Sequence, residues 1–265
     1  MRTRIISAII GIVILGFIVN TGGLIYTLGV CCLNLLALFE LYTAFKNINI
    51  DINLFVSFFF TFAIYFISYF QNNLLLNFIS FCFVMMISMS FTYNIINNKK
   101  VDLIGIVFTI FSFTYTTMLF VYFILTRNLV NGVYIVWWIF VITWVCDSAA
   151  FFTGTLFGKN KLAPDISPNK TIEGSIGGIL LSSLASLVFI KLFLIDISII
   201  NAILFGILIG FFCEIGDLSA SAIKRYCKVK DFSNIIPGHG GILDRFDSAL
   251  FSFPIAYYLI TLLHL

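Results

Sequence analysis

The sequence has little charge. Of its 265 residues, 10% are Asp, Glu, Lys or Arg, whereas 61% are hydrophobic, and the mean hydropathy is +1.09. A soluble domain carries about 25% charged residues. The deficit excludes an ordinary soluble domain and predicts a polytopic integral membrane protein. We expect no nucleic-acid partner.

Paired cysteine motifs are also missing. None of the six cysteines forms a C-x-x-C pair, and five lie inside apolar runs, where Cys acts as a small hydrophobe. This pattern indicates neither a disulfide framework nor a zinc site. Cys227 alone lies in a polar stretch, so we expect it to be the thiol most open to aqueous reagents.

Long polar segments are absent as well. The two polar connections of any length, 158–173 and 219–245, are too short for a soluble domain. A transmembrane helix needs about 20 apolar residues, and the first apolar run shows no cleavage site, so it reads as a retained helix. The sequence predicts an all-α bundle of about nine transmembrane helices, at 5–20, 22–44, 52–70, 73–93, 103–126, 132–157, 174–195, 199–218 and 246–264.

The basic residues predict the orientation of these helices. With nine spans and a cytoplasmic N-terminus, thirteen of the fifteen Lys and Arg fall on the cytoplasmic side, and only Arg127 and Lys191 fall outside. Cytoplasmic loops are enriched in Lys and Arg. We therefore expect the N-terminus inside and the C-terminus outside. We divide the single membrane domain into N-terminal helices, 1–130, and a C-terminal catalytic region, 131–265.

Four acids lie within or at the edge of apolar runs: Glu40, Asp147, Glu214 and Asp217. An acid at the bilayer centre costs roughly 2.5–3.5 kcal/mol, so such residues face a protein or water interior. A structural role and a functional role are both open for each. The strongest functional candidate is Asp217, because the residues that share its helix face by spacing are Glu214, Ser221 and Lys224.

The first polar connection reads GKNKLAPDISPNKTIEGS. Thr171 is predicted to cap the following helix. Lys159, Lys161 and Lys170 place positive charge beside that helix start, which itself favours anions. Ordinary cytoplasmic-loop lysines would look the same. Small residues at every fourth position, from Ala150 to Gly158, and in the run 174–178 predict close helix packing.

The second polar connection contains Pro237-Gly-His239-Gly-Gly241 and then Asp244-Arg245-Phe-Asp247. Glycines allow close backbone approach, and successive N–H groups form anion nests. Mg²⁺ is usually held by one or two carboxylates and substrate oxygens. This pattern indicates transfer at phosphorus, at the cytoplasmic face, on a membrane substrate. The simpler alternative is that the basic residues of 224–230 only attract anionic lipid, worth about 1 kcal/mol each.

The stretch SAIKRYCKVKDFSNIIPGHGGILDRFD, residues 221–247, resembles the signature of the phosphatidate cytidylyltransferase (CDP-diacylglycerol synthase) family. DSAAFFTGTLFGKNKLAPDISPNKTIEG resembles the family's upstream block, and RIISAII its usual start. The clear likeness covers about 147–247. The sequence departs from the family at Asn169, where many members carry Lys, which leaves a role for residue 169 in doubt but not one for Lys170.

The resemblance implies a reaction that joins phosphatidate to CTP and releases pyrophosphate, with Mg²⁺ and a second cation as candidate cofactors. It implies metal ligation by Asp217 and Asp244, and we add Asp247, with Asp147, Glu214 and Asp231 as weaker candidates. The predicted catalytic residues are Asp217, Lys224, His239 and Asp244. The predicted substrate-binding residues are Ser167, Lys170, Ser221, Arg225, Lys230, Gly240, Gly241 and Arg245.

Two other functions stay open at this stage. A CTP-dependent polyprenol or phytol kinase would transfer the γ-phosphate and release CDP. A transporter would explain the intramembrane acids, but we see no pair of broken helices at matching positions in two halves. We expect the protein in a bacterial inner membrane, with its active site at the cytoplasmic face. The sequence leaves a homodimer open.

Overall fold

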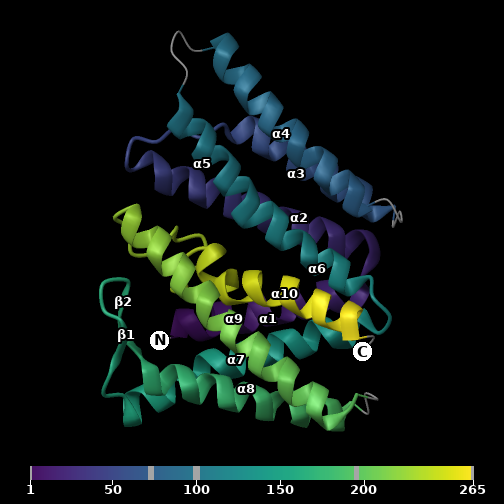
Figure 1. Ribbon diagram of the computed structural model, residues 1–265, viewed down its shortest axis with the longest axis vertical. Helices are drawn as coiled ribbons and strands as arrows, with labels where there is room; N and C mark the ends of the chain where they lie inside the picture. The colour runs from purple at the N-terminus through teal and green to yellow at the C-terminus, as the bar shows by residue number, and fades with distance from the viewer. Residues whose placement is uncertain (1, 71–74, 98–101, 194–196, 264–265) are drawn as a thin grey trace. The chain divides into compact units, whose positions relative to one another are not determined.

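The computed structural model describes residues 2–70, 75–97, 102–193 and 197–263. Within these ranges the chain is helical apart from its connections and one small β-hairpin (Figure 1). Two of the thirteen basic residues assigned to the cytoplasmic side, Lys99 and Lys100, and the C-terminal residue Leu265 lie outside the described residues. The helices are α1 (Arg2–Thr21), α2 (Gly23–Lys46), α3 (Leu54–Tyr69), α4 (Leu75–Asn97), α5 (Leu103–Phe113), a π-helical turn (Thr114–Met118), α6 (Leu119–Arg127), α7 (Gly132–Phe157), α8 (Ile172–Leu192), α9 (Ile199–Tyr226) and α10 (Leu243–Leu263).

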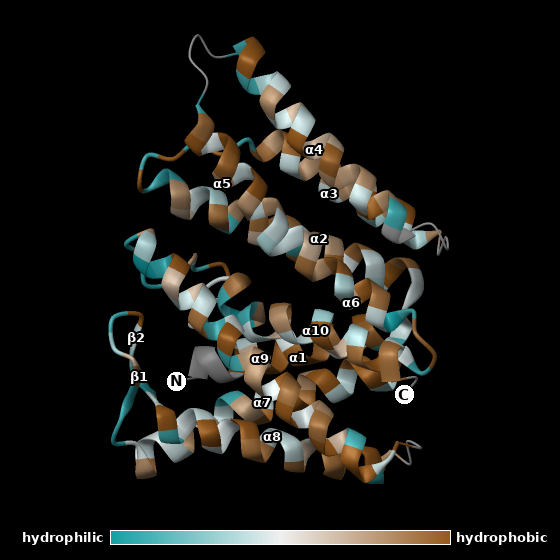
Figure 2. Ribbon diagram, in the orientation of Figure 1, coloured by the Kyte–Doolittle hydropathy of each residue, from teal (hydrophilic) through white to brown (hydrophobic). Residues whose placement is uncertain are grey.

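The predicted helical membrane protein is confirmed. Segments α5, the π-helical turn and α6 run on as one helix, Leu103–Arg127, so each predicted span corresponds to a helix in the described part. Seven helices there are long and apolar enough to cross a bilayer, whereas α3 and the Ile6–Thr21 part of α1 are shorter. Apolar residues run along most of the helices (Figure 2). The count of nine spans and the cytoplasmic N-terminus stay predictions.

Two helices extend beyond their predicted spans, and both extensions carry site residues. α9 ends at Tyr226 rather than near residue 218, so Ser221 and Lys224 lie on the helix, in register with Asp217. α10 begins at Leu243, and Asp244 lies in its first turn. Polar residues continue these helices past the apolar runs, where a hydropathy boundary cannot detect them.

The first polar connection is a hairpin that the sequence analysis did not predict. Strand β1 (Lys161–Ala163) pairs antiparallel with β2 (Ser167–Thr171). The turn is closed by Ile166 N donating to Ala163 O at 3.2 Å. Proline is favoured at the second position of such turns because its φ is already suitable, and Pro164 occupies that position.

Thr171 caps α8, as predicted. Its hydroxyl oxygen accepts a hydrogen bond from Gly174 N at 3.1 Å. The cap joins the hairpin directly to the helix, because Thr171 is also the last residue of β2. The orientation of the hairpin is therefore coupled to the start of α8.

The chain forms two compact units. The first comprises Met1–Ile124 together with Cys227–Arg245, and the second comprises Leu125–Tyr226 together with Phe246–Leu265. The glycine-rich connection is part of the first unit. The division into residues 1–130 and 131–265 stays a prediction.

Small residues bring α7, α8 and α9 of the second unit together, as predicted. A Cβ atom on Gly174 would lie 2.8 Å from Ala150 O, and one on Gly206 would lie 2.6 Å from Ser183 Cα. In the same unit Trp138 Nε1 donates to Ser186 Oγ at 3.1 Å. The close approach of these backbones leaves the facing helices little freedom to shift.

Candidate active site

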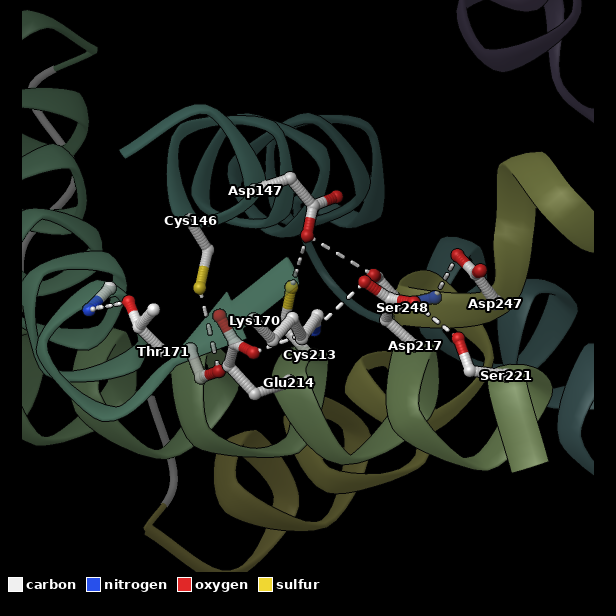
Figure 3. A network of polar contacts seen from close by, with 12 residues as sticks. Cys146, Asp147, Lys170, Thr171, Cys213, Glu214, Asp217, Ser221, Asp247 and Ser248 are labelled. Atoms are coloured by element: carbon white, nitrogen blue, oxygen red, sulfur yellow. Dashed lines mark hydrogen bonds and ion pairs between the residues drawn. The ribbon is translucent and has the colours of Figure 1, made fainter. Parts of the chain in front are cut away.

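The second unit contains a cluster of charged side chains between the hairpin and α9 (Figure 3). Lys170 Nζ lies 2.7 Å from Glu214 Oε2 and 2.8 Å from Asp217 Oδ2. The two acids are three residues apart on α9 and share a face. Lys170 comes from β2, one residue before the cap of α8. The hairpin thus carries the ammonium to a pair of carboxylates more than 40 residues away in the sequence.

The cluster is partly shielded from solvent. The exposed fraction of the side chain is 6% for Glu214, 20% for Lys170 and 31% for Asp217. Burial lowers the pKa of the Lys170 ammonium, but the charges of Asp217 and Glu214 raise it by more, so the pKa lies above its ordinary value. Lys170 therefore stays protonated at neutral pH.

The cluster has an excess of acceptors. Two carboxylates face one ammonium, and Glu214 Oε1 is buried without a hydrogen-bond partner among the described residues. Asp217 Oδ1 accepts a hydrogen bond from Ser221 Oγ at 3.3 Å, one helical turn further on. Lys224, half-buried, follows Ser221 along α9. The arrangement favours a further cation, because carboxylate oxygens outnumber the positive charges that face them.

A second set of contacts joins α7, α9 and α10 within the same unit. Asp147 Oδ1 accepts hydrogen bonds from Cys213 Sγ at 3.4 Å and from Ser248 Oγ at 3.3 Å. Asp247 Oδ1 accepts from Ser248 N at 2.8 Å. Cys213 and Ser248 are not among the predicted site residues, because a small residue in or beside an apolar run gives no sign of a polar partner on another helix.

Of the other predicted residues in this unit, Arg225 has a defined contact. It ends α9, and its Nε donates to Ile166 O at 3.1 Å in the hairpin turn. Ser167 is half-buried at the start of β2. The structure thus brings Lys170, Glu214 and Asp217 together, and Arg225 holds the hairpin that carries Lys170.

The glycine-rich connection belongs to the first unit and forms a tight turn. Gly238 and Gly240 have φ values of 77° and 85°, in the left-handed region that glycine adopts without strain. Ile236 N donates to Gly240 O, and His239 N donates to Ile236 O, both at 2.9 Å. Two of the three glycines are therefore explained by backbone conformation.

Protein carboxylates accept hydrogen bonds from the backbone N–H groups at the end of this connection. Gly241 N donates to Asp244 Oδ2 at 2.9 Å, and Phe232 N donates to the same oxygen at 2.9 Å. Ile242 N and Leu243 N each donate to the carboxylate of Glu40, both at 2.8 Å. Substrate binding by Gly240 and Gly241 stays a prediction; in this arrangement the acceptor of the Gly241 N–H is Asp244.

His239 and Arg245 contact each other in this turn. Arg245 Nε donates to His239 O at 2.7 Å, and His239 Nδ1 lies 2.8 Å from Ser7 Oγ of α1. Arg245 is exposed, and Lys230 and Asp231 are exposed at the start of the connection. The charged groups of Lys230, Asp231 and Arg245 are therefore accessible to solvent at the surface of the connection.

The prediction for Cys227 is wrong. The residue lies in the polar stretch, but only 1% of it is exposed. Burial raises the pKa of its thiol to about 11. Thiol reactivity depends on the thiolate and on access, so Cys227 is a poor target for aqueous reagents.

Among the described residues, no group of three or more His, Cys, Asp or Glu is placed to hold a metal ion. Asp217 and Asp244 belong to different units, so their joint ligation of a metal stays a prediction, as does ligation by Asp147, Asp231 or Asp247. Glu214 and Asp217 offer oxygen ligands only. One or two carboxylates are the usual protein contribution to a Mg²⁺ site, so this pair fits a hard cation.

The fold and the charged cluster define a polytopic membrane protein with a partly buried ionic site. The sequence matches the cytidylyltransferase family over residues 2–263, and the chain belongs to this family. It is 35% identical to the phosphatidate cytidylyltransferase of Bacillus subtilis over 266 aligned residues. This alignment covers 99% of this chain and 98% of the relative. It is also 36% identical over 259 residues to the protein of the same name from Staphylococcus epidermidis, covering 96% and 97%.

Proposed function

We propose that this protein is a phosphatidate cytidylyltransferase, a membrane-bound nucleotidyltransferase that converts phosphatidate and CTP into CDP-diacylglycerol and pyrophosphate. The similarity to relatives of that name extends over nearly the whole chain. The observation that carries the proposal is the cluster of Lys170, Glu214 and Asp217, in which a lysine of the hairpin meets two acids of the membrane helix α9. A lipid kinase and a transporter have no comparable support.

In the proposed reaction, a phosphate oxygen of phosphatidate attacks the α-phosphorus of CTP. A new P–O bond forms, the bond to the β-phosphate oxygen breaks, and pyrophosphate leaves. Both reactants are anions, so the main task of the protein is positioning and charge stabilisation. Lys170 is suited to bind a phosphate oxygen because its ammonium remains charged and is held by two carboxylates.

We propose that Glu214 and Asp217 contribute carboxylate oxygens to a Mg²⁺ ion, with phosphate oxygens of the substrates as further ligands. When bound, the ion would neutralise charge on the phosphates. The unpartnered Glu214 Oε1 and the surplus of carboxylate over ammonium support this assignment. The roles of Asp244 and of a second cation stay predictions.

The chain is an integral membrane protein. We propose the bacterial inner membrane, with the site at the cytoplasmic face. The connection between α7 and α8 and the end of α9 are basic, and basic loops favour the cytoplasm. The basic residues are Lys159, Lys161, Lys170, Lys224 and Arg225. A homodimer stays a prediction.

The test uses purified protein in detergent micelles with CTP, Mg²⁺ and phosphatidate, and measures pyrophosphate and the lipid product. We expect one pyrophosphate per CDP-diacylglycerol and no CDP. Parallel reactions offer a polyprenol or phytol as the acceptor. Release of CDP with a lipid alcohol, and no pyrophosphate with phosphatidate, would assign the protein to the lipid kinases instead.

A further inference from the structure

Glu40 is a fully buried acid of α2 whose contacts lie about 200 residues further along the chain, within the same unit. Its exposed fraction is 0%. Oε1 accepts hydrogen bonds from Ser233 Oγ at 2.6 Å and from Ile242 N at 2.8 Å, and Oε2 accepts from Leu243 N at 2.8 Å. Both carboxylate oxygens are therefore engaged by the connection that leads into α10.

These contacts fall at the start of a helix. Leu243 is the first residue of α10, and the first N–H groups of a helix have no partner within it. A carboxylate there is favoured both by hydrogen bonding and by the helix dipole. Glu40 thus supplies from α2 the acceptors that a neighbouring N-cap side chain usually supplies.

Gly241 lies so close to the Glu40 carboxylate that a side chain at this position would collide with it. A Cβ atom on Gly241 would lie 2.5 Å from Glu40 Oε1 and 2.7 Å from Oε2. Gly241 has no positive φ that would demand glycine, unlike Gly238 and Gly240. The requirement for glycine at 241 therefore comes from the close approach of Glu40.

The segment held in this way carries predicted catalytic groups. Asp244 Oδ2 accepts from Gly241 N, so the N–H groups of three consecutive residues, 241–243, all donate to the two carboxylates. A shift of Glu40 would release the N–H groups of Ile242 and Leu243. It would also loosen the turn on which Asp244 and Arg245 stand.

We propose that Glu40 is a positioning residue for the transfer reaction. It fixes the Pro237–Gly241 turn and the first turn of α10, and acts through Asp244 and Arg245 without touching the substrate. This inference rests on the proposed function. It also explains why α2, which supplies none of the predicted substrate contacts, contains a fully buried acid.

The main variant is Glu40→Gln, which keeps the size of the side chain. The carboxamide of Gln has one acceptor oxygen and one NH₂ group, whereas the carboxylate of Glu40 accepts hydrogen bonds at both oxygens. The NH₂ group must therefore face at least one of the three donors, Ser233 Oγ, Ile242 N and Leu243 N, and cannot accept a hydrogen bond from that donor. Misplacement of a catalytic group by about 1 Å can cost on the order of 100-fold in rate. We expect a fall of that order in kcat, with a much smaller change in the KM for CTP.

Gly241→Ala is the second variant and should cause a similar fall in kcat. Both changes disturb the same contact, between Glu40 and the turn at residues 241–243, so kcat of the double variant should be little lower than that of either single variant.

The matched control is Asn34→Ala on the same helix. Asn34 is fully buried and donates to Tyr65 OH at 3.3 Å, so its loss lowers stability without reaching the turn. Its kcat should stay near wild type.

Amide hydrogen exchange followed by mass spectrometry gives a readout that does not depend on activity. In Glu40→Gln, exchange should rise in peptides that cover residues 232–245, and it should stay unchanged there in Asn34→Ala. If Glu40→Gln does not fold, Ser233→Ala removes the 2.6 Å bond to Glu40 together with the 3.3 Å bond from Ile235 N to Ser233 Oγ, and leaves the two backbone bonds to Glu40 in place. A smaller rise in exchange and a smaller fall in kcat are then expected.

A wild-type kcat in folded Glu40→Gln overturns the positioning role, even if the melting temperature falls. Unchanged exchange at 232–245 overturns the contact itself. Absence of pyrophosphate from the wild-type protein with phosphatidate and CTP would instead count against the proposed function, and the exchange data would still report on the contact.

Discussion

Replacement of Lys170 by Met tests the charged cluster most directly. The change keeps a long side chain and removes the ammonium that lies within 2.8 Å of both Glu214 and Asp217. Glu214, with 6% of its side chain exposed, then has no counter-charge from the hairpin. Breaking a fully buried ion pair costs about 3–5 kcal/mol because a charge is left unpaired.

The expected magnitude is smaller here because the cluster is not fully buried. Lys170 is 20% exposed and Asp217 is 31% exposed, and exposed ion pairs contribute about 1 kcal/mol or less. We therefore expect Lys170→Met to lower the free energy of unfolding by about 1–3 kcal/mol. Adding Glu214→Gln should restore part of the loss, with a coupling free energy of about 0.5–3 kcal/mol.

The assay is unfolding in detergent micelles, followed by tryptophan fluorescence. All three tryptophans, Trp137, Trp138 and Trp144, lie on α7 of the same unit. The control is Lys161→Met, an exposed lysine of the same hairpin. Equal stability of the Lys170 and Lys161 variants, together with zero coupling to Glu214, would refute the reasoning.

The pH dependence of this stabilisation has a defined sign. The pKa of Lys170 is raised in the folded protein, so its contribution is fully present below the unfolded pKa of about 10.4 and is lost as pH rises through the folded value. The difference in stability between wild type and Lys170→Met should therefore be the same at pH 7 and pH 9. A marked decrease between these values would show that the ammonium titrates in that range.

Three further predictions concern the site and the topology. Asp217→Asn should retain less than a tenth of wild-type pyrophosphate release while the protein still purifies. The control Asp165→Asn, at the exposed hairpin turn, should be close to wild type. Near-normal turnover of the Asp217 variant at saturating Mg²⁺ would exclude Asp217 as a metal ligand. Lys224→Ala should reduce pyrophosphate release strongly and Lys228→Ala little, because Lys224 lies on the same face of α9 as Asp217; equal, mild losses in micelles would favour simple attraction of anionic lipid. In Val130→Cys, at a position that is 87% exposed, the new thiol should react with a membrane-impermeant thiol reagent in intact cells. In Asp165→Cys it should react only after permeabilisation. The reverse pattern would contradict the predicted orientation.

Local features of the sequence were sufficient for the helices and for part of the site. An apolar run long enough to cross a bilayer has few alternatives to a helix, because backbone groups cannot be left unpaired in lipid. The spacing of Asp217 and Ser221 placed them on one face, and the structure shows the hydrogen bond between them. Thr171 as a helix cap also followed from local chemistry. The helix prediction rests on a contiguous run of about 20 residues, and the other two inferences involve residues within four positions of one another.

Contacts between distant segments required the tertiary structure. Lys170 was predicted to bind phosphate, but its partners, Glu214 and Asp217, lie on another helix. Glu40 was open to either role until its hydrogen bonds to Ile242 N and Leu243 N were visible. Periodicity and spacing determine which side of a helix a residue occupies, but not which other segment faces that side. That choice depends on how the backbones pack, and here small residues such as Gly241 permit the approach.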